Sequence, residues 1–218
     1  MKSSITVKNS GVIRFPGTNC DRDVYQAVEN LGRKPQWLWY EDQFDYNEFD
    51  AIYVPGGFSF GDYLRSGALA ARTPVMKSVR EAASHGMPIL GICNGFQILC
   101  EAQLLPGVLL KNDGLRFRDE WVDLKVRNAT GHFSSGAVQS LRLPIAHGDG
   151  RYFIHGDGLK KLHDQNQVWL TYQRNPNGSI EDIAGVMNEG KNVMALMPHP
   201  ERAIFDWMGS CDGVGFFA

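Results

Sequence analysis

Three residues that lie far apart in the sequence have the side-chain types for acyl transfer: Cys93, His199 and Glu201. Cys93 lies in the segment GICNG at 91–95, between a short apolar run and a helical pattern. This spacing matches the nucleophile-elbow pattern G-x-S-x-G with cysteine in place of serine, in which a tight strand-to-helix turn exposes the nucleophile. The helix N-terminus favours a thiolate there, because its free N–H groups and dipole stabilise negative charge.

A general base for this thiol is expected in the segment MPHPER at 197–202. His199 and Glu201 are two residues apart, so an extended backbone points both side chains the same way. His199 can then exchange a proton with Cys93 while Glu201 fixes the tautomer of the imidazole. We therefore predict that Cys93, His199 and Glu201 are the catalytic residues.

Acyl transfer also needs hydrogen-bond donors for the oxyanion of the tetrahedral intermediate. The residue after an elbow nucleophile supplies one backbone N–H, which here is Asn94, and a glycine loop on a neighbouring strand end supplies another. The loop PGGFSFG at 55–61 fits this role. It does not fit a phosphate loop, because no Gly-Lys-Ser/Thr follows.

Each of these features also has a purely structural interpretation. A cysteine at a strand end is often a small buried hydrophobic residue, and His-x-Glu can cap a helix. Cys20, in the loop after the first strand, either lines the site or belongs to a helix start capped by Asn19 or Asp21. The repeated HGDG segments at 147–150 and 155–158 are metal ligands or, more in keeping with their composition, turns. Cys100 is expected in the core.

The elements that must position these residues follow a β-α-β order in the first half of the chain. Apolar runs at 11–15, 36–40, 51–54 and 88–90 alternate with helical patterns at 21–31 and 75–84. This order predicts an open, mostly parallel α/β sheet with helices on both faces, which binds ligands at the carboxyl ends of its strands. Further strands are predicted at 121–127, 140–143, 168–172, 183–186 and 193–197. Several of them are joined by short turns, which predicts antiparallel additions to the sheet.

Aromatic residues give two further expectations. Trp37, Trp39 and Trp121 fall in strand patterns and are expected in the core. Phe216 and Phe217 stand at the end of the chain, where they either pack on a partner as exposed side chains or belong to a frayed terminus.

Composition narrows the class of protein. The 218 residues include 43% hydrophobic and 21% charged residues, with a formal net charge of −2. These values give no sign of a nucleic-acid or membrane surface, and no apolar run approaches the length that spans a bilayer. The four cysteines are spread widely and form no C-x-x-C pair, which favours free thiols and a cytoplasmic location.

Five segments together resemble a known family: RFPGTNCD at 14–21, PGGFSFGDYLRSGA at 55–68, GICNGFQIL at 91–99, IAHGDG at 145–150 and MPHPERA at 197–203. They are similar to class I, triad-type glutamine amidotransferases, whose fold is flavodoxin-like. Within that family they resemble the glutaminase subunits of phosphoribosylformylglycinamidine synthases. We therefore expect one amidotransferase domain over residues 11–218 and an N-terminal extension over residues 1–10.

The resemblance implies the reaction. Cys93 would hydrolyse glutamine to glutamate and ammonia, with Gly57 and Asn94 as the oxyanion hole and Gln97 binding glutamine. A synthetase subunit would use the ammonia, with ATP and Mg²⁺, to convert formylglycinamide ribonucleotide to the amidine in purine biosynthesis, and a small accessory subunit would join the complex. No cofactor or metal is expected in this chain. The alternatives are another triad-type amidotransferase, a cysteine hydrolase on the same fold, or a regulatory subunit without activity.

Overall fold

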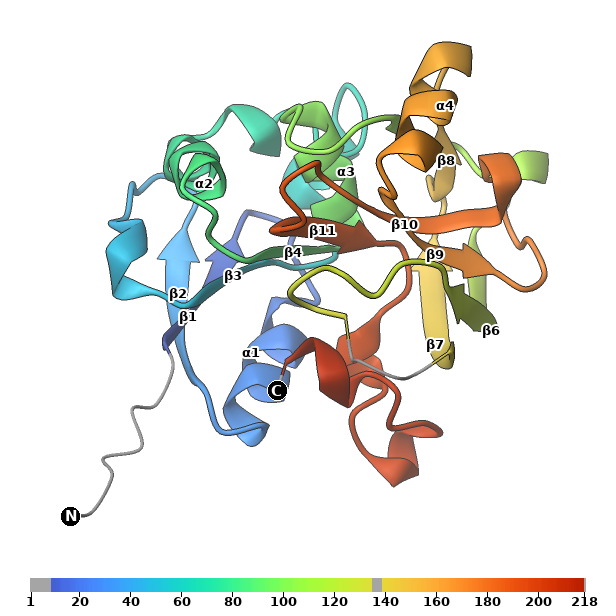
Figure 1. Cartoon of the computed structure of the whole chain (residues 1–218). Helices are drawn as coiled ribbons and strands as arrows, with labels where there is room; N and C mark the ends of the chain where they lie inside the picture. The colour runs from blue at the N-terminus through green and yellow to red at the C-terminus, as the bar shows by residue number, and fades with distance from the viewer. Residues whose placement is uncertain (1–8, 135–138, 218) are drawn as a thin grey trace.

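One mixed sheet of nine strands organises the protein, and a computed structural model describes residues 9–134 and 139–217 of it (Figure 1). Across the sheet the order is β2 (Lys34–Trp39), β1 (Asn9–Arg14), β3 (Ala51–Val54), β4 (Ile89–Ile92), β11 (Val193–Leu196), β10 (Ile183–Met187), β9 (Val168–Tyr172), β6 (Arg118–Val126) and β7 (Ser140–His147). The first five strands are parallel, and the pairs from β11 to β7 are antiparallel. The predicted fold class is therefore confirmed.

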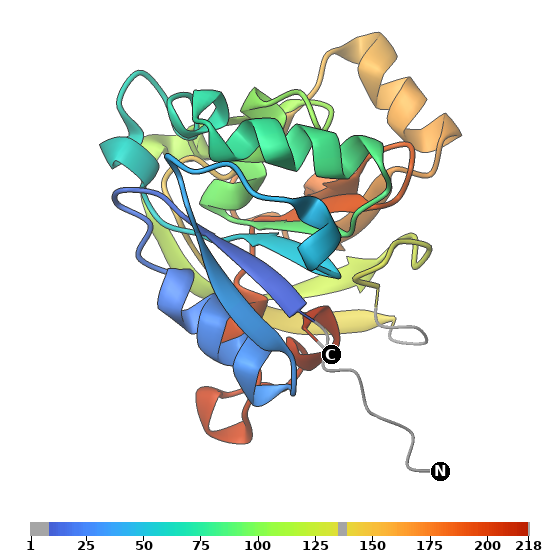
Figure 2. The same cartoon turned by 90° about the vertical axis from the view of Figure 1, so that its left-hand side faces the viewer.

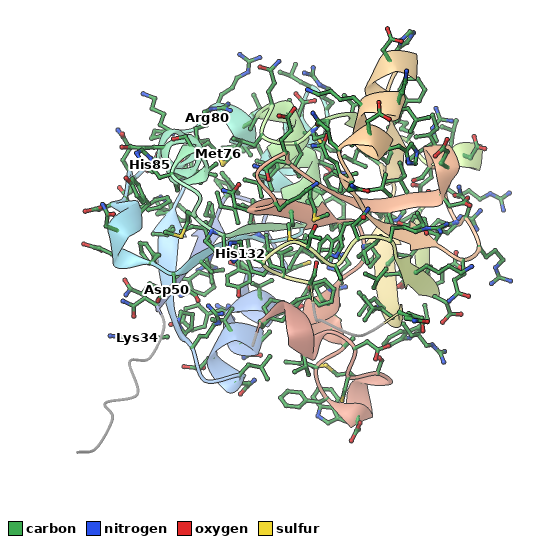
Figure 3. The ribbon with its side chains drawn as sticks, in the orientation of Figure 1. Lys34, Asp50, Met76, Arg80, His85 and His132 are labelled. Carbon is green, nitrogen blue, oxygen red and sulfur yellow. The ribbon has the colours of Figure 1, made fainter. Side chains whose placement is uncertain are left out.

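The parallel strands at the centre are short apolar runs that are buried on both faces. All four residues of β3, β4 and β11 are buried, as expected where helices cover both sides of a sheet. Lys34, at the start of β2, and Asp50, just before β3, lie near each other at the amino edge of the sheet (Figure 3). The loops that carry the predicted site residues leave from the opposite, carboxyl edge.

Helices pack on both faces of this parallel half. α1 (Asp21–Asn30) covers one face, and α2 (Val75–Ser84) and α3 (Asn94–Glu101) cover the other (Figures 1 and 2). In α2 the buried residues Val75, Val79 and Ala82 recur at helical spacing, while Arg80 lies on the exposed side of the same helix, away from the sheet (Figure 3). The helices predicted at 21–31 and 75–84 are therefore both present.

The antiparallel half of the sheet curls back towards the parallel half. Three strands separate β7 from β11 in the sheet order, yet the backbone N–H of His199, just after β11, donates to the carbonyl of Pro144 in β7 at 2.8 Å. Ala146, also in β7, accepts a hydrogen bond from the Cys93 thiol at 3.8 Å. The curl therefore closes one side of the region around Cys93.

Two small elements complete the fold. β5 (Val108–Leu110) and β8 (Arg151–Phe153) form a separate two-stranded sheet, and α4 (Gly156–Asp164) follows β8. The second HGDG segment forms the start of α4 rather than an isolated turn, whereas the first ends β7 and turns there. Within the described residues, every helix is too short or too polar to span a lipid bilayer.

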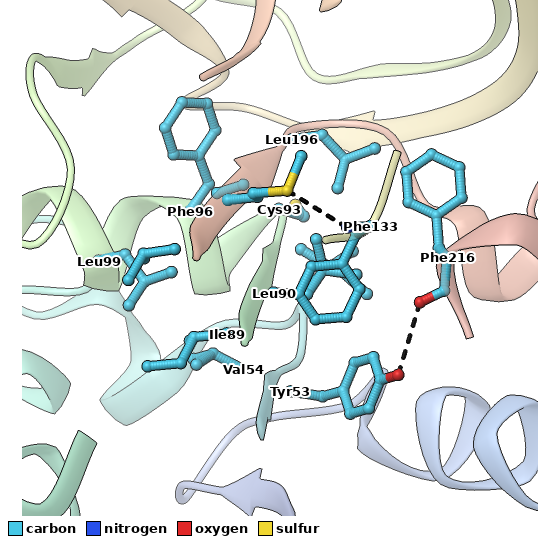
Figure 4. Packing of buried hydrophobic residues seen from close by; sticks show 14 of the residues in the cluster. Tyr53, Val54, Ile89, Leu90, Cys93, Phe96, Leu99, Phe133, Leu196 and Phe216 are labelled. Atoms are coloured by element: carbon cyan, nitrogen blue, oxygen red, sulfur yellow. Dashed lines mark hydrogen bonds between the residues drawn. The ribbon is translucent and has the colours of Figure 1, made fainter. Parts of the chain in front are cut away.

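The C-terminal phenylalanines are part of the core, which corrects both expectations for them. Phe216 and Phe217 expose 2% and 0% of their surfaces. Phe217 stacks on Tyr53 of β3 with ring centroids 5.5 Å apart, and the Tyr53 hydroxyl donates to the Phe216 carbonyl (Figure 4). The end of the chain thus folds back beneath the central strands.

The tryptophans of β2 are partly exposed, whereas they were expected in the core. Trp37 and Trp39 expose 40% and 41% of their surfaces, because β2 is an edge strand with a neighbouring strand on one side only. Trp37 stacks on Tyr25 of α1 and lies under the guanidinium of Arg14. Trp121 in β6 is partly buried.

The boundary expected at residue 11 falls inside β1, which begins at Asn9. Residues 1–8 of the expected N-terminal extension, and Ala218 at the end of the expected domain, lie outside the described residues.

Candidate active site

Cys93 occupies a strained turn between β4 and α3. Its φ of 51° and ψ of −104° lie outside the regions that most residues adopt, and it stands at the N-cap of α3. Strain of this kind persists only where the surrounding structure enforces it, and it is common at functional sites. The turn is the elbow that the sequence predicted.

A glycine after the nucleophile allows the elbow to pack closely on β3. A Cβ on Gly95 would lie only 1.8 Å from the carbonyl oxygen of Val54, at the end of β3. No side chain fits in that space, so glycine is needed two residues after Cys93. The close contact between the elbow and β3 thus explains the second glycine of the G-x-C-x-G pattern.

His199 and Glu201 form a buried pair beside this turn. Nδ1 of His199 lies 2.6 Å from Oε1 of Glu201, and each residue exposes 1% of its surface. A 3-10 turn over Pro200–Arg202 follows β11 in place of the extended backbone that was expected there, and both side chains are nevertheless buried on the same side. Glu201 is therefore placed to orient the imidazole and to stabilise its charged form.

Gly56 marks the point where the nucleophile and the histidine meet. A Cβ on Gly56 would lie 2.8 Å from Cε1 of His199, 3.3 Å from the Cβ of Cys93 and 3.3 Å from the Sγ of Cys20. All three residues therefore surround one small space that only glycine leaves free. The structure brings Cys93, His199 and Glu201 together although more than a hundred residues separate the first from the others.

The charge on His199 is favoured by its neighbours. Burial opposes a charged imidazole, but the Glu201 carboxylate and the Cys93 sulfur, with a smaller contribution from Cys20, raise the pKa of His199 well above its usual value. A histidine that holds a proton in this position can donate it to a leaving group.

Of the two predicted oxyanion donors, Asn94 belongs to the elbow and Gly57 to the glycine loop after β3. Asn94 opens α3, so its backbone N–H is among the first-turn donors that have no partner within the helix. Gly57 lies in the loop after β3, packed against the backbone of Thr18 and Asn19. Their use by an oxyanion stays a prediction.

The side chain of Asn94 ties this glycine loop to α3. Its Oδ1 accepts the backbone N–H of Ser59 at 3.1 Å, and its Nδ2 donates to Oε1 of Gln97 at 2.7 Å. Gln97 in turn donates from Nε2 to the carbonyl of Asp149 at 2.7 Å. Both ends of the Gln97 amide therefore contact protein atoms, and a contact with a ligand stays a prediction.

Several residues of the site could not be identified as site residues from the sequence pattern alone. Asp149 accepts a hydrogen bond from the hydroxyl of Ser66 at 2.8 Å, which links the loop after β3 to the first HGDG segment. Ser66 and Asp149 lie in two of the segments that resemble the amidotransferase family, and nothing else in the sequence indicated that they lie at the site. Gly56 lies in the glycine loop, but only packing shows which glycine faces the histidine.

His147, in the first HGDG segment, is a buried structural histidine. Its Nδ1 bonds Oδ1 of Asn112 at 3.0 Å, and that oxygen also accepts the backbone N–H of Gly150. Burial, the charge of His199 and that of Arg118 lower the pKa of His147 to about 4, so the ring is neutral near pH 7.

Cys20 lies at the site rather than in a capped helix start. It is itself the N-cap residue of α1, without a side-chain cap, while Asp21 pairs with Arg14 at 2.7 Å. Its Sγ, a ring nitrogen of His199 and a carboxylate oxygen of Glu201 all lie within 4.8 Å of one another. Among the described residues this is the one His, Cys, Asp and Glu cluster compact enough for a metal ion, and neither HGDG segment takes part in it. Cys100 is buried, as expected.

Comparison with known proteins agrees with this geometry. Residues 8–212 match the model of a family described as the CobB/CobQ-like glutamine amidotransferase domain. A chain of the PurLQS structure from Thermotoga maritima is 45% identical, with a TM-score of 0.89 over 97% of this chain and 96% of that one.

Two more distant structures share the fold. A candidate GMP synthase subunit from Thermoplasma acidophilum is 15% identical, with a TM-score of 0.67 over 97% of this chain and 94% of that one. A glutamine amidotransferase from Thermotoga maritima is 16% identical, with a TM-score of 0.60 over 91% and 78%. At this level of identity the likeness shows the fold alone.

Proposed function

The chain belongs to the CobB/CobQ-like glutamine amidotransferase family, and from that premise we propose that it is the glutaminase subunit of a phosphoribosylformylglycinamidine synthase. One observation carries the chemistry: His199, held by Glu201 at 2.6 Å, meets the elbow cysteine Cys93 around Gly56. The 45% identity with a chain of the PurLQS structure supports the choice of this branch of the family.

The first half-reaction forms a thioester. His199 takes the proton of the Cys93 thiol, and the thiolate attacks the side-chain amide carbon of glutamine. The N–H groups of Gly57 and Asn94 stabilise the oxyanion that forms. The carbon–nitrogen bond then breaks as His199 returns the proton to the departing nitrogen, and ammonia leaves.

The second half-reaction regenerates the enzyme. His199 removes a proton from a water molecule that attacks the thioester, the carbon–sulfur bond breaks, and the Cys93 sulfur takes a proton back while glutamate leaves. The raised pKa keeps His199 protonated until it gives its proton to the departing nitrogen, and Glu201 keeps the ring oriented through both steps.

The closed state of the site supports coupling to a partner. Cys93 exposes 5% of its surface and His199 1%, so both reacting side chains have little contact with solvent in this arrangement of the surrounding loops. We infer that a synthetase subunit, which carries the ATP and Mg²⁺, favours the open form, and that a small accessory subunit completes the complex. A cytoplasmic location and the absence of a cofactor in this chain stay predictions.

Release of ammonia from glutamine tests the proposal. We expect slow release by the chain alone and faster release when the synthetase subunits and their substrates are present. The same assay separates the alternatives, because a cysteine hydrolase would act on other amides or esters without the synthetase, and an inactive regulatory subunit would release no ammonia. A Cys93→Ala protein with full glutaminase activity would exclude the mechanism.

A further inference from the structure

A second buried thiol beside the catalytic pair has no part in the mechanism above. Cys20 exposes 3% of its surface and lies with His199 and Glu201 in a cluster whose ligand atoms are all within 4.8 Å of one another. Arg202 donates a hydrogen bond to the Sγ of Cys20 at 3.2 Å. Burial raises the pKa of the Cys20 thiol above its usual value although Arg202 opposes this, so a metal ion must displace the thiol proton to bind the sulfur.

Two atoms of this cluster have lone pairs or protons that no neighbour satisfies. Within the described residues, Nε2 of His199 and Oε2 of Glu201 are buried without a hydrogen-bond partner. Because Nδ1 of His199 bonds Glu201, Nε2 is the nitrogen that exchanges a proton with Cys93, and the mechanism accounts for it. Buried polar atoms are nearly always paired, so Oε2 of Glu201 is the atom that points to a missing ligand. The nitrogen, oxygen and sulfur atoms here are the donors that Zn²⁺ uses in proteins.

We propose that Cys20, His199 and Glu201 form an inhibitory site for a thiophilic divalent cation such as Zn²⁺. Tetrahedral zinc holds its sulfur and nitrogen ligands about 3.5 Å apart, so the cluster needs side-chain shifts of about 1 Å to close around the ion. The site differs from that of the Mg²⁺ expected in the synthetase, because Mg²⁺ selects oxygen ligands and leaves a thiolate free.

The charges of the site balance when the ion is present. A divalent cation is neutralised by the Cys20 thiolate and the Glu201 carboxylate, with His199 neutral. Arg202 then keeps Asp23 as its counter-ion, with 3.5 Å between Nε and Oδ2. A buried metal site without net charge avoids the cost of burying an unpaired ion.

The bound ion would stop catalysis by occupying two residues of the triad. Glu201 could no longer orient the imidazole, and His199 could no longer carry a proton for Cys93. This inhibition rests on the proposed glutaminase function, whereas the binding of the metal does not.

Optical titration with Co²⁺ tests the binding on the full chain without any need for activity. The Cys93→Ala protein removes the nucleophile as a competing thiol. We expect it to bind one Co²⁺ with a sulfur-to-cobalt charge-transfer band, which the additional change Cys20→Ser abolishes. The matched control Cys211→Ser, made in the same Cys93→Ala background, changes an exposed thiol and should keep the band. A band that survives Cys20→Ser, or that disappears with Cys211→Ser, would overturn the site.

Inhibition by Zn²⁺ tests the consequence in proteins that retain Cys93. Relative to each protein's own metal-free rate, Cys20→Ser should raise the inhibitory Zn²⁺ concentration at least tenfold, while Cys211→Ser leaves it unchanged. Cys20→Ala gives the same comparison without a buried hydroxyl. Equal inhibition of the wild-type and Cys20 variants would overturn the proposal. If no variant shows glutaminase activity, the proposed function fails, and the Co²⁺ titration still decides the metal site.

Discussion

Gly56 and His199 are in such close contact that a methyl group on the glycine would lie 2.8 Å from Cε1 of the histidine ring. Real Cβ atoms do not come this close to a neighbour, and the same position lies 3.3 Å from the Cβ of Cys93. The absence of a side chain at Gly56 therefore allows the base His199 and the nucleophile Cys93 to pack around the same position, although Gly56 takes no part in proton transfer.

The substitution Gly56→Ala should displace His199 and lower kcat for glutamine by about 100-fold, since misplacement of a reacting group by about 1 Å has effects of this size. Ammonia release with the synthetase complex measures it. The matched control Gly156→Ala adds a methyl group at the start of α4, where no atom lies within 4 Å, and should not change the rate. Equal rates for the two variants would contradict the role of Gly56.

The substitution Glu201→Gln should lower the pKa of His199, because the carboxylate is the strongest of the groups that raise it. The protonated imidazole is needed for ammonia to leave, so the alkaline limb of the kcat–pH profile should move to lower pH and kcat should fall. A profile with an unmoved alkaline limb would show that Glu201 does not set the protonation of His199.

The same pair makes stability depend on pH. The pKa of His199 is raised on folding, so its stabilising contribution is complete below about pH 6.5, the usual histidine pKa, and is lost as pH rises through the raised value. Denaturant unfolding of the wild-type protein and the Glu201→Gln variant across this range should show a smaller alkaline loss in the variant. Parallel curves would be evidence against the ion pair.

The substitution Asn94→Ala should impair both the site and the fold. It removes the acceptor of the Ser59 N–H and the donor to Gln97, and each buried group left unpaired costs about 1–3 kcal/mol. We expect a lower free energy of unfolding and a higher KM for glutamine. The control Asn47→Ala changes an exposed asparagine that bonds only Asp45 among the described residues, so its effect should stay within about 0.5 kcal/mol.

The lowered pKa of His147 should make the folded protein less stable in acid. Its pKa of about 4 in the folded protein lies below the usual value of about 6.5, so between these values the unfolded chain binds a proton that the folded one does not. Stability should therefore fall as pH drops from 6.5 to 4, by about 3 kcal/mol from this residue.

The variant His147→Asn should lose less stability than the wild-type protein across that range, as measured by urea unfolding at each pH. The control His155→Asn, at an exposed histidine, should follow the wild-type curve. If all three proteins lose stability in parallel, the acid sensitivity has another source.

The central elements of the fold could be predicted because their patterns are local. The strands at 51–54 and 168–172 and the helix at 75–84 have the predicted limits, since apolar runs and helical periodicity end where the elements end. The exposure of Trp37 and Trp39 could not be predicted, because it depends on the position of β2 at the sheet edge and not on its own residues. The burial of Phe217 depends on Tyr53, which lies more than 160 residues away.

The candidate site likewise combines features that local sequence patterns predict with features that depend on tertiary packing. The elbow around Cys93 and the His-x-Glu spacing are local signals, and both are present in the structure. The place of Cys20 beside His199 depends on the packing of the loop after β1 against the end of β11, and no local pattern distinguishes it from a helix cap. The curl that brings Ala146 to Cys93 is likewise a property of the whole sheet.

The most direct test of the account is to look for the acyl group on Cys93. The protein is mixed with glutamine and the synthetase complex, quenched in acid within the first turnovers, digested and analysed by mass spectrometry. We predict a glutamyl thioester on the peptide that contains Cys93, and none in the Cys93→Ala protein or on the peptides of Cys20, Cys100 and Cys211. Ammonia release without any acyl group on Cys93, or an acyl group on another residue, would contradict the proposed mechanism.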